Sequence, residues 1–167
     1  MKTLKDILID IPTIHIVGDV DMPVANLQID SRKVAAGDVF FAQQGTIVDG
    51  HNYIDQVITN GAKVVFCQVM PASISAEITY VQVADVSAIV GLVAANYYDH
   101  PSRDMKVVGV TGTNGKTTIA TLLYQTYMAL GYYSGLISTV ANHIGHTVIP
   151  STHTTPDPVS LQALFAQ

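Results

Sequence analysis

The segment that most constrains the fold of this chain is Gly112-Thr-Asn-Gly-Lys-Thr-Thr118. It follows an apolar run at 105–110 that predicts a buried strand, and it leads into residues 116–130, whose apolar spacing predicts a helix. Its two glycines allow the backbone to curl closely around an anion. The start of the helix adds unpaired N–H groups and the positive end of the helix dipole. The sequence therefore predicts a strand, a phosphate-binding loop and a helix, in that order.

The side chains of this loop predict that ATP and Mg²⁺ bind there. Lys116 is expected to contact the terminal phosphates as the catalytic residue, and the Thr117 hydroxyl to ligate Mg²⁺. The predicted phosphate cradle consists of Gly112, Thr113, Asn114, Gly115, Lys116, Thr117 and Thr118. The usual spacing asks for a glycine at 110, where this chain has valine and the nearby glycine is Gly109. The loop alone does not distinguish a kinase from a GTPase or a ligase.

Composition indicates a folded, mildly acidic protein. Apolar residues make up 49% of the 167 positions and charged residues 13%, which excludes a disordered chain. The net charge of −5 and the lack of a basic stripe argue against nucleic acid as the main partner. No run of about 18 apolar residues predicts a membrane span, and residues 1–10 suggest a short amphipathic helix. The single Cys67 lies in an apolar run, so we expect a buried thiol and a cytoplasmic location.

Strands alternate with helices along the rest of the chain, which predicts an α/β layer fold. The expected strands are 25–30, 39–42, 63–67, 79–83 and 136–137, and the expected helices are 53–61 and 85–98, the latter with Asp85 as N-cap. Pro101 interrupts the pattern, so we place a boundary there between domains 1–103 and 104–167. Residues 158–167 begin as a helix with proline in its first turn and then stop, and we expect this chain to be part of a longer protein.

Two motif blocks resemble the Mur ligase family, the amide-forming enzymes of peptidoglycan synthesis. Val110-Thr-Gly-Thr-Asn-Gly-Lys-Thr-Thr118 is similar to the family's ATP loop, including its variant glycine spacing. Asp30-Ser-Arg-Lys-Val-Ala-Ala-Gly-Asp-Val-Phe-Phe-Ala42, followed by Gly45 and Asp49-Gly-His-Asn-Tyr-Ile54, resembles the UDP-binding domain of two members. Those two members add the third residue and the terminal dipeptide of the peptide stem. Ser138-Thr-Val-Ala-Asn142 and Thr152-His-Thr-Thr-Pro-Asp157 favour the third-residue ligase.

The resemblance covers essentially the whole chain and implies both a fold and a reaction. Domain 1–103 would be a Rossmann-like domain for the UDP-linked substrate, and 104–167 the incomplete beginning of a central P-loop ATPase domain. ATP would phosphorylate the carboxylate of UDP-N-acetylmuramoyl-L-alanyl-D-glutamate, and the amine of the third amino acid would displace phosphate. That amino acid is meso-diaminopimelate or L-lysine in the family, and these residues leave the choice open.

The resemblance also implies substrate contacts. The uridine end would meet Ile29, Asp30, Ser31, Thr46 and Ile47, and the muramoyl and diphosphate region would meet His153, Thr154 and Thr155. Thr139 would join Thr117 near Mg²⁺. The plainer interpretation of residues 30–32 is a polar turn that ends a strand, and that of 152–155 is a polar turn before Pro156. His143 and His146 flank Gly145 in a predicted hairpin, which argues against a zinc site.

Three other functions stay open at this point. They are the dipeptide-adding ligase, a stand-alone P-loop phosphotransferase or GTPase, and a non-catalytic nucleotide-sugar binding module. We expect negligible ligase activity from the 167-residue chain, because the family's C-terminal amino-acid domain is not in it. We also expect apolar surface at 107–110 and 122–130 to cause either disorder after about residue 104 or self-association.

Overall fold

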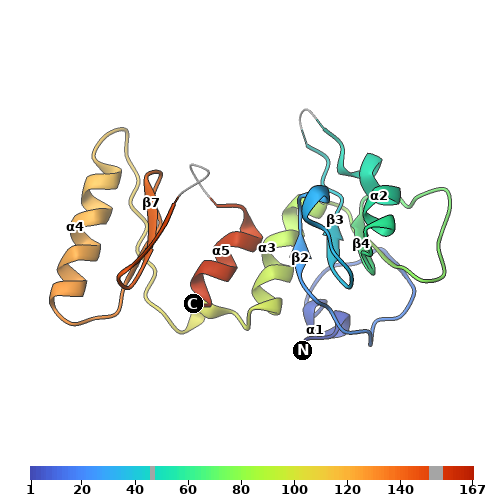
Figure 1. Cartoon of the computed structure of the whole chain (residues 1–167), viewed down its shortest axis with the longest axis horizontal. Coiled ribbons are helices and arrows are strands. Elements are labelled where there is room, and N and C mark those ends of the chain that lie inside the picture. The colour runs from blue at the N-terminus through green and yellow to red at the C-terminus, as the bar shows by residue number, and fades with distance from the viewer. Residues whose placement is uncertain (46–47, 151–155) are drawn as a thin grey trace. The chain divides into compact units, whose positions relative to one another are not determined.

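The computed structural model describes residues 1–45, 48–150 and 156–167. The chain divides into two compact units, Met1–His100 and Pro101–Gln167, which are drawn in blue to green and in yellow to red in Figure 1.

The first unit is built on a five-stranded sheet in the order β1-β5-β4-β3-β2. The strands are β1 His15–Val17, β2 Leu27–Gln28, β3 Val39–Phe41, β4 Val64–Cys67 and β5 Thr79–Gln82. Strands β2 to β5 run parallel, and β1 pairs antiparallel with β5 at one edge. The carboxyl ends of four strands therefore meet at one edge of the sheet. The strands expected at 25–30, 39–42, 63–67 and 79–83 are confirmed, and β1 is an additional one.

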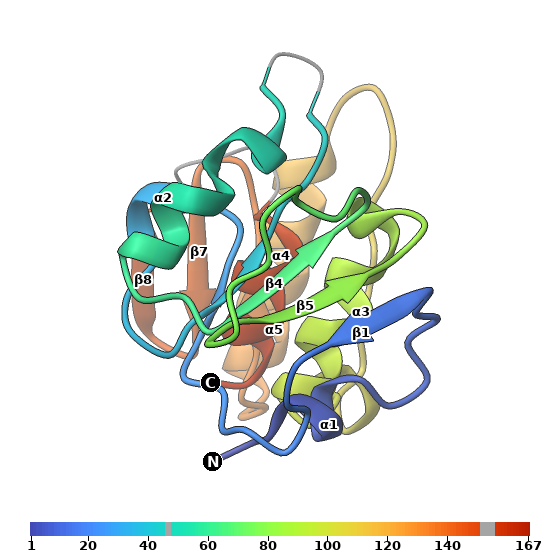
Figure 2. The ribbon, with the colours of Figure 1, turned by 90° about the vertical axis from the view of Figure 1, so that its right-hand side faces the viewer.

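Helices cover both faces of this sheet. Figure 2 shows α2 (Ile54–Thr59) in front of β4 and β5, and α3 (Val86–Tyr97) behind them. Every residue of β4 is buried, as is typical of a parallel strand covered on both sides. On the α2 face, Phe40, Val57 and Tyr80 belong to one core cluster. Residues one position along a strand point the opposite way, and there Phe41 stacks on Phe66 with ring centroids 4.9 Å apart.

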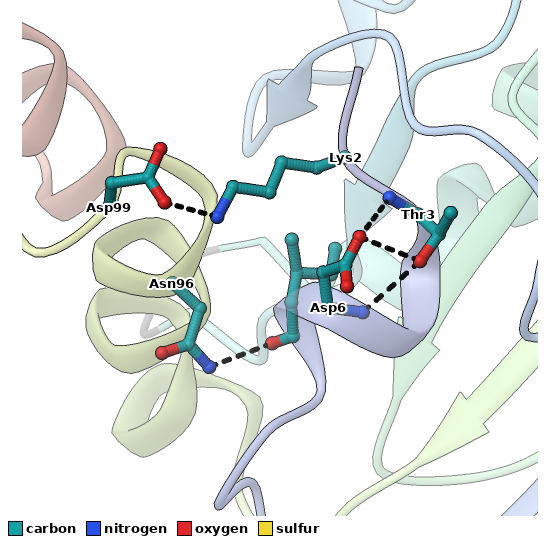
Figure 3. A network of polar contacts seen from close by, with 6 residues as sticks. Lys2, Thr3, Asp6, Asn96 and Asp99 are labelled. Atoms are coloured by element: carbon teal, nitrogen blue, oxygen red, sulfur yellow. Dashed lines mark hydrogen bonds and ion pairs between the residues drawn. The ribbon is translucent and has the colours of Figure 1, made fainter.

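The N-terminal helix is fixed to α3 by a buried asparagine. Helix α1 (Leu4–Ile7) is shorter than the amphipathic segment 1–10 suggests, and it starts with a capping box between Thr3 and Asp6. Asn96 of α3 donates from Nδ2 to the carbonyl of Ile7, 3.1 Å away (Figure 3). The same nitrogen donates to the carbonyl of Ile9 at 2.7 Å. A buried amide is stabilising here because its donors are satisfied.

The described part of the second unit contains a short 3-10 helix (η3), two α-helices and a small antiparallel sheet. Its elements are η3 Pro101–Arg103, α4 Lys116–Ala129, β6 Gly135–Leu136, β7 Ala141–Ile144, β8 Thr147–Pro150 and α5 Pro158–Phe165. The sheet order is β6-β7-β8, and β7 and β8 form the hairpin expected around Gly145. Gly145 has φ of +52°, and a Cβ there would lie 2.4 Å from the Tyr133 ring, so glycine is required at this turn.

The strand expected at 105–110 is wrong. These residues have no regular structure, and Val107 and Val108 are 59% and 65% exposed. A strand needs a neighbour for its backbone hydrogen bonds, and none of the described segments pairs with 105–110. The strand expected at 136–137 exists as β6, and it pairs antiparallel with β7. In the described part of the chain, no helix is both long and apolar enough to span a bilayer.

Candidate functional site

The phosphate-loop segment has a backbone that only glycine accepts easily at two positions. Gly112 has φ of +148° and Gly115 has φ of +78°, both in the region that disfavours side chains. Gly115 is also the N-cap residue of α4, in the left-handed conformation. Nothing lies within 4 Å of the position that a Cβ would take on Gly115. The space next to the first turn of α4 is therefore open.

The start of α4 differs from the start of α3 in how its amides are satisfied. In α3, the Asp85 carboxylate accepts hydrogen bonds from the amides of Ser87 and Ala88, at 2.8 and 3.3 Å. In α4, Gly115 supplies no side-chain cap. The first N–H groups of a helix need an external partner when no side chain caps them. An anion such as phosphate suits that position, because the helix dipole is positive there.

Lys116 is the first residue of α4, and its side chain folds back over the loop. Its Nζ donates to the carbonyl of Gly112 at 2.6 Å and to that of Thr113 at 3.3 Å. The residue is exposed, so the ammonium remains accessible to a ligand. Hydrogen bonds from an ammonium to phosphate oxygens are stronger than those to neutral carbonyls. A bound phosphate would therefore compete well for this lysine.

The two threonines predicted to bind Mg²⁺ lie on different elements. Thr117 follows Lys116 in the first turn of α4 and is half-buried. Thr139 lies in an exposed bend between β6 and β7. Both metal assignments stay predictions, as do the cradle roles of Thr113, Asn114 and Thr118.

The predicted uridine contacts Ile29, Asp30 and Ser31 come directly after β2, at the carboxyl edge of the sheet. Asp30 caps the short helix η1 (Ser31–Lys33) by accepting the amide of Arg32 at 3.0 Å. The Arg32 guanidinium also donates to both carboxylate oxygens of Asp30, at 2.9 and 2.8 Å. These bonds hold the pKa of Asp30 at about 2, chiefly through the Arg32 side chain. Asp30 is thus an ionised group at the edge where parallel sheets bind ligands.

This geometry contains the polar turn that was the plainer interpretation of residues 30–32. A turn at the carboxyl edge is compatible with both interpretations, so the uridine role of these residues stays a prediction. Five further predicted contacts, Thr46, Ile47, His153, Thr154 and Thr155, lie outside the described residues.

Sequence reasoning assigned no role to two polar groups of the first unit, the buried Asp38 and the half-buried His51. Asp38, just before β3, accepts hydrogen bonds from the side chains of Asn26 and Gln28 and from the amide of Ala35. It thereby fixes β2 and the turn that follows it. His51 accepts hydrogen bonds from two amides beyond β4. Its partners, Gln68 and Val69, are distant in sequence, and the sequence carries no local signal for them.

Comparison with known proteins follows the division into two units. Residues 23–98 match the model described as Mur ligase family, catalytic domain, and residues 110–167 match the model described as Mur ligase middle domain. Relatives named UDP-N-acetylmuramoyl-L-alanyl-D-glutamate–2,6-diaminopimelate ligase occur in Bacteroides fragilis, at 48% identity, and in Clostridium acetobutylicum, at 40% identity. Each alignment covers 98% of this chain and 34% of the relative. The chain thus spans about a third of the length of these relatives.

Solved structures agree with the fold. A structure titled UDP-N-acetylmuramoyl-L-alanyl-D-glutamate–2,6-diaminopimelate ligase matches 99% of this chain with a TM-score of 0.73 at 23% identity, covering 33% of that protein. The D-alanyl-D-alanyl ligase of Acinetobacter baumannii, which acts on the diaminopimelate-containing precursor according to its name, matches 77% of this chain and 28% of its own. Its TM-score is 0.57 at 26% identity. Because both units match domains of one family in the family's order, and the relatives align over nearly every residue, this chain belongs to the Mur ligase family.

Proposed function

We propose that this chain carries the UDP-substrate and ATP-phosphate sites of a cytoplasmic ligase that adds the third amino acid to UDP-N-acetylmuramoyl-L-alanyl-D-glutamate. The observation that carries the proposal is 48% identity across 98% of the chain to a relative named for that reaction. The names of the relatives favour 2,6-diaminopimelate over L-lysine as the amino acid. The proposed domains are 1–103 for the UDP-linked substrate and 104–167 for the beginning of the ATP-binding domain.

The chemistry that this assignment requires starts with a poor acylating group. A carboxylate oxygen of the dipeptide attacks the γ-phosphorus of ATP, the bond to the β-phosphate oxygen breaks, and ADP leaves with an acyl phosphate formed. The neutral amine of the amino acid then attacks the acyl carbon. The carbon–nitrogen bond forms, phosphate leaves, and the amine loses a proton. Such a phosphoryl transfer depends mainly on positioning and charge stabilisation by the protein.

The loop fits the part that the chain's own residues would have in this transfer. The uncapped first turn of α4 offers amides to the phosphates, and Lys116 offers a charge now held by the carbonyls of Gly112 and Thr113. Thr117 and Thr139 are the proposed Mg²⁺ ligands, and Mg²⁺ would neutralise phosphate charge when bound. The open space at Gly115 is compatible with a bound phosphate.

Binding to the 167-residue chain tests the two halves of the proposal separately. Isothermal titration should detect UDP-N-acetylmuramoyl-L-alanyl-D-glutamate at the first unit and a non-hydrolysable ATP analogue at the second. Lys116→Ala should weaken the ATP analogue at least tenfold, because a charged phosphate contact is lost. Lys106→Ala removes an exposed lysine of the same unit, ten residues earlier, and should leave the affinity unchanged. Equal weakening by both variants would contradict the role of Lys116.

Catalysis provides a further check. We expect no measurable tripeptide formation by the 167-residue chain with ATP, Mg²⁺ and diaminopimelate. The alignment covers only 34% of the matched relative, so about two thirds of the relative's length has no counterpart here. Robust ATP-dependent amide formation by this chain would show that the amino-acid site lies within it. Binding of the UDP-linked substrate without any ATP-analogue binding would instead support a nucleotide-sugar binding module.

A further inference from the structure

His51 joins two loop segments at the carboxyl edge of the first unit's sheet. It lies in η2 (Gly50–Tyr53), and its side chain is 16% exposed. Its Nε2 lies 3.0 Å from the amide nitrogen of Gln68 and 3.3 Å from that of Val69, the first two residues after β4. A backbone N–H can only donate, so Nε2 must be the acceptor and carries no proton in this arrangement.

The other ring nitrogen is held by Asp49. His51 Nδ1 lies 2.6 Å from Asp49 Oδ1, and the same oxygen accepts the His51 amide at 2.9 Å. Because Nε2 is unprotonated, Nδ1 carries the proton and donates it to the carboxylate. These bonds lower the pKa of Asp49, first through the His51 amide and then through the ring. The contacts therefore select one neutral tautomer of His51 and one orientation of its ring.

This histidine connects the ends of neighbouring strands. The amide of Gly50 donates to the carbonyl of Gln43 at 2.8 Å, and Gln44 and Asp49 form a β-bridge, so the turn that carries His51 is fastened to the end of β3. On the other side, Gln68 follows β4, and its carbonyl accepts from the Gln82 side chain of β5 at 3.1 Å. His51 thus sets the spacing between the segments that follow β3 and β4.

We propose that His51 is a positioning residue of the UDP-substrate site, acting through the backbone of Gln68 and Val69. The inference rests on the proposed function, which places the UDP-linked substrate at this edge. Ligands of parallel sheets bind outside the carboxyl ends of the strands, where the loops must keep a fixed spacing. In this role His51 touches the loop amides and not the substrate.

Two substitutions separate the acceptor from the rest of the side chain. In His51→Gln, the amide oxygen reaches the place of Nε2 and can accept the two amides. In His51→Asn, the shorter side chain reaches only the place of Nδ1, and the amides of Gln68 and Val69 lose their partner. We expect His51→Asn to weaken UDP-N-acetylmuramoyl-L-alanyl-D-glutamate binding by about tenfold in titration calorimetry. His51→Gln should restore the affinity to within about threefold of the unchanged chain.

The outcomes distinguish this inference from the proposed function. If the unchanged chain binds no UDP-linked substrate, the proposed function fails and this role fails with it. If it binds and His51→Asn binds equally well, only the role of His51 is overturned. Circular dichroism checks that both variants fold. Long-range ¹H–¹⁵N spectra of the unchanged chain give a second test without any variant, because they report which ring nitrogen of His51 carries the proton. A proton on Nδ1 supports the inference, and a proton on Nε2 overturns it.

Discussion

The two units of this chain contain similar apolar runs but bury them to very different extents. In the first unit, Val64, Val65 and Phe66 of β4 are fully buried. In the second unit, Val107 and Val108 are more than half exposed. Among the described residues 101–150 and 156–167, Leu136 is the one buried apolar side chain. The first unit therefore has its own core, and the second exposes the apolar surface that a core would use.

The difference shows what an apolar run requires to become a strand. Strand β4 lies between β3 and β5, and helices cover both faces of the sheet, so backbone and side chains are satisfied together. Residues 105–110 have no strand neighbour among the described segments, so an extended backbone there would gain no strand hydrogen bonds and would not bury the valine side chains. Burial of apolar surface contributes about 25 cal/mol per Å² to folding, and β4 gains this contribution while 105–110 does not.

The largest expected effect of this contrast is on stability. Phe66→Ala removes a fully buried ring that stacks on Phe41, and it should lower the free energy of unfolding by about 3–5 kcal/mol. Leu122→Ala, in a helix where this side chain is 56% exposed, should change it by no more than about 0.5 kcal/mol. Urea unfolding followed by far-UV circular dichroism measures both. Comparable losses from the two variants would show that the second unit has a core of its own.

A second consequence is that the exposed face of α4 promotes self-association. Ile119 and Leu122 of α4 are 51% and 56% exposed, and Leu130 at its C-cap is 66% exposed, which is unusual for large apolar side chains so close together. Sedimentation velocity should show a mass that rises with concentration, and Leu122→Glu should keep the chain monomeric because it adds charge to this face. A monomeric unchanged chain with slow amide exchange throughout 105–130 would contradict this prediction.

The two helix starts offer a reciprocal test. Asp85→Ala removes the cap of α3 and should lower the stability of the first unit by about 1 kcal/mol without changing ATP-analogue affinity. Gly115→Ala puts a side chain at φ of +78° in the open loop. It should weaken the ATP analogue while leaving the unfolding of the first unit unchanged. Titration calorimetry measures the ATP-analogue affinity of both variants, and urea unfolding measures their stability. A weaker ATP-analogue affinity of Asp85→Ala would contradict the different roles of the two helix starts.

The sequence predicted those elements whose signals are local. The helix expected at 85–98 is α3 Val86–Tyr97, because Asp85 marks its start and apolar residues mark its buried face. The strand expected at 63–67 is β4, whose residues Val64–Cys67 form a continuous apolar run. Strand β1 was missed because His15–Val17 is three residues long and largely uncovered, so no alternation distinguishes it. The error at 105–110 has the opposite origin, since an apolar pattern encodes a tendency to be buried but not the presence of a partner.

The candidate sites follow the same rule. The candidate phosphate loop could be predicted because its glycines, lysine and threonines lie within seven consecutive residues. The structure confirms that a helix begins at Lys116, and the phosphate contacts stay a prediction. The contacts of His51 could not be predicted from the sequence, because the two amides that its ring accepts lie 17 and 18 residues away. Asp38 was missed for a related reason: two of its donors, Asn26 and Gln28, lie just before and within β2. Contacts that depend on strand pairing appear only once the sheet is assembled.

The smallest expected effect concerns the pH dependence of the first unit. Burial raises the pKa of the Cys67 thiol from its ordinary value of 9.0 to about 11. Between these values the unfolded chain has lost a proton that the folded chain keeps, so the thiol's contribution to stability is complete below about pH 9 and is lost as pH rises toward 11. Burial also raises the pKa of Tyr97, which acts in the same direction. Cys67→Ala isolates the thiol, because it retains Tyr97.

Unfolding measured from pH 7.5 to 10.5 should therefore show a smaller loss of stability for Cys67→Ala than for the unchanged chain. Val108→Cys extends the comparison to the second unit, because that position is 65% exposed. At pH 8, a thiol reagent should modify the introduced cysteine quickly and Cys67 slowly, since the reacting species is the accessible thiolate. Equal reaction rates for the two thiols would mean that Cys67 is as accessible in solution as position 108. The contrast in burial between the two units would then not hold in solution.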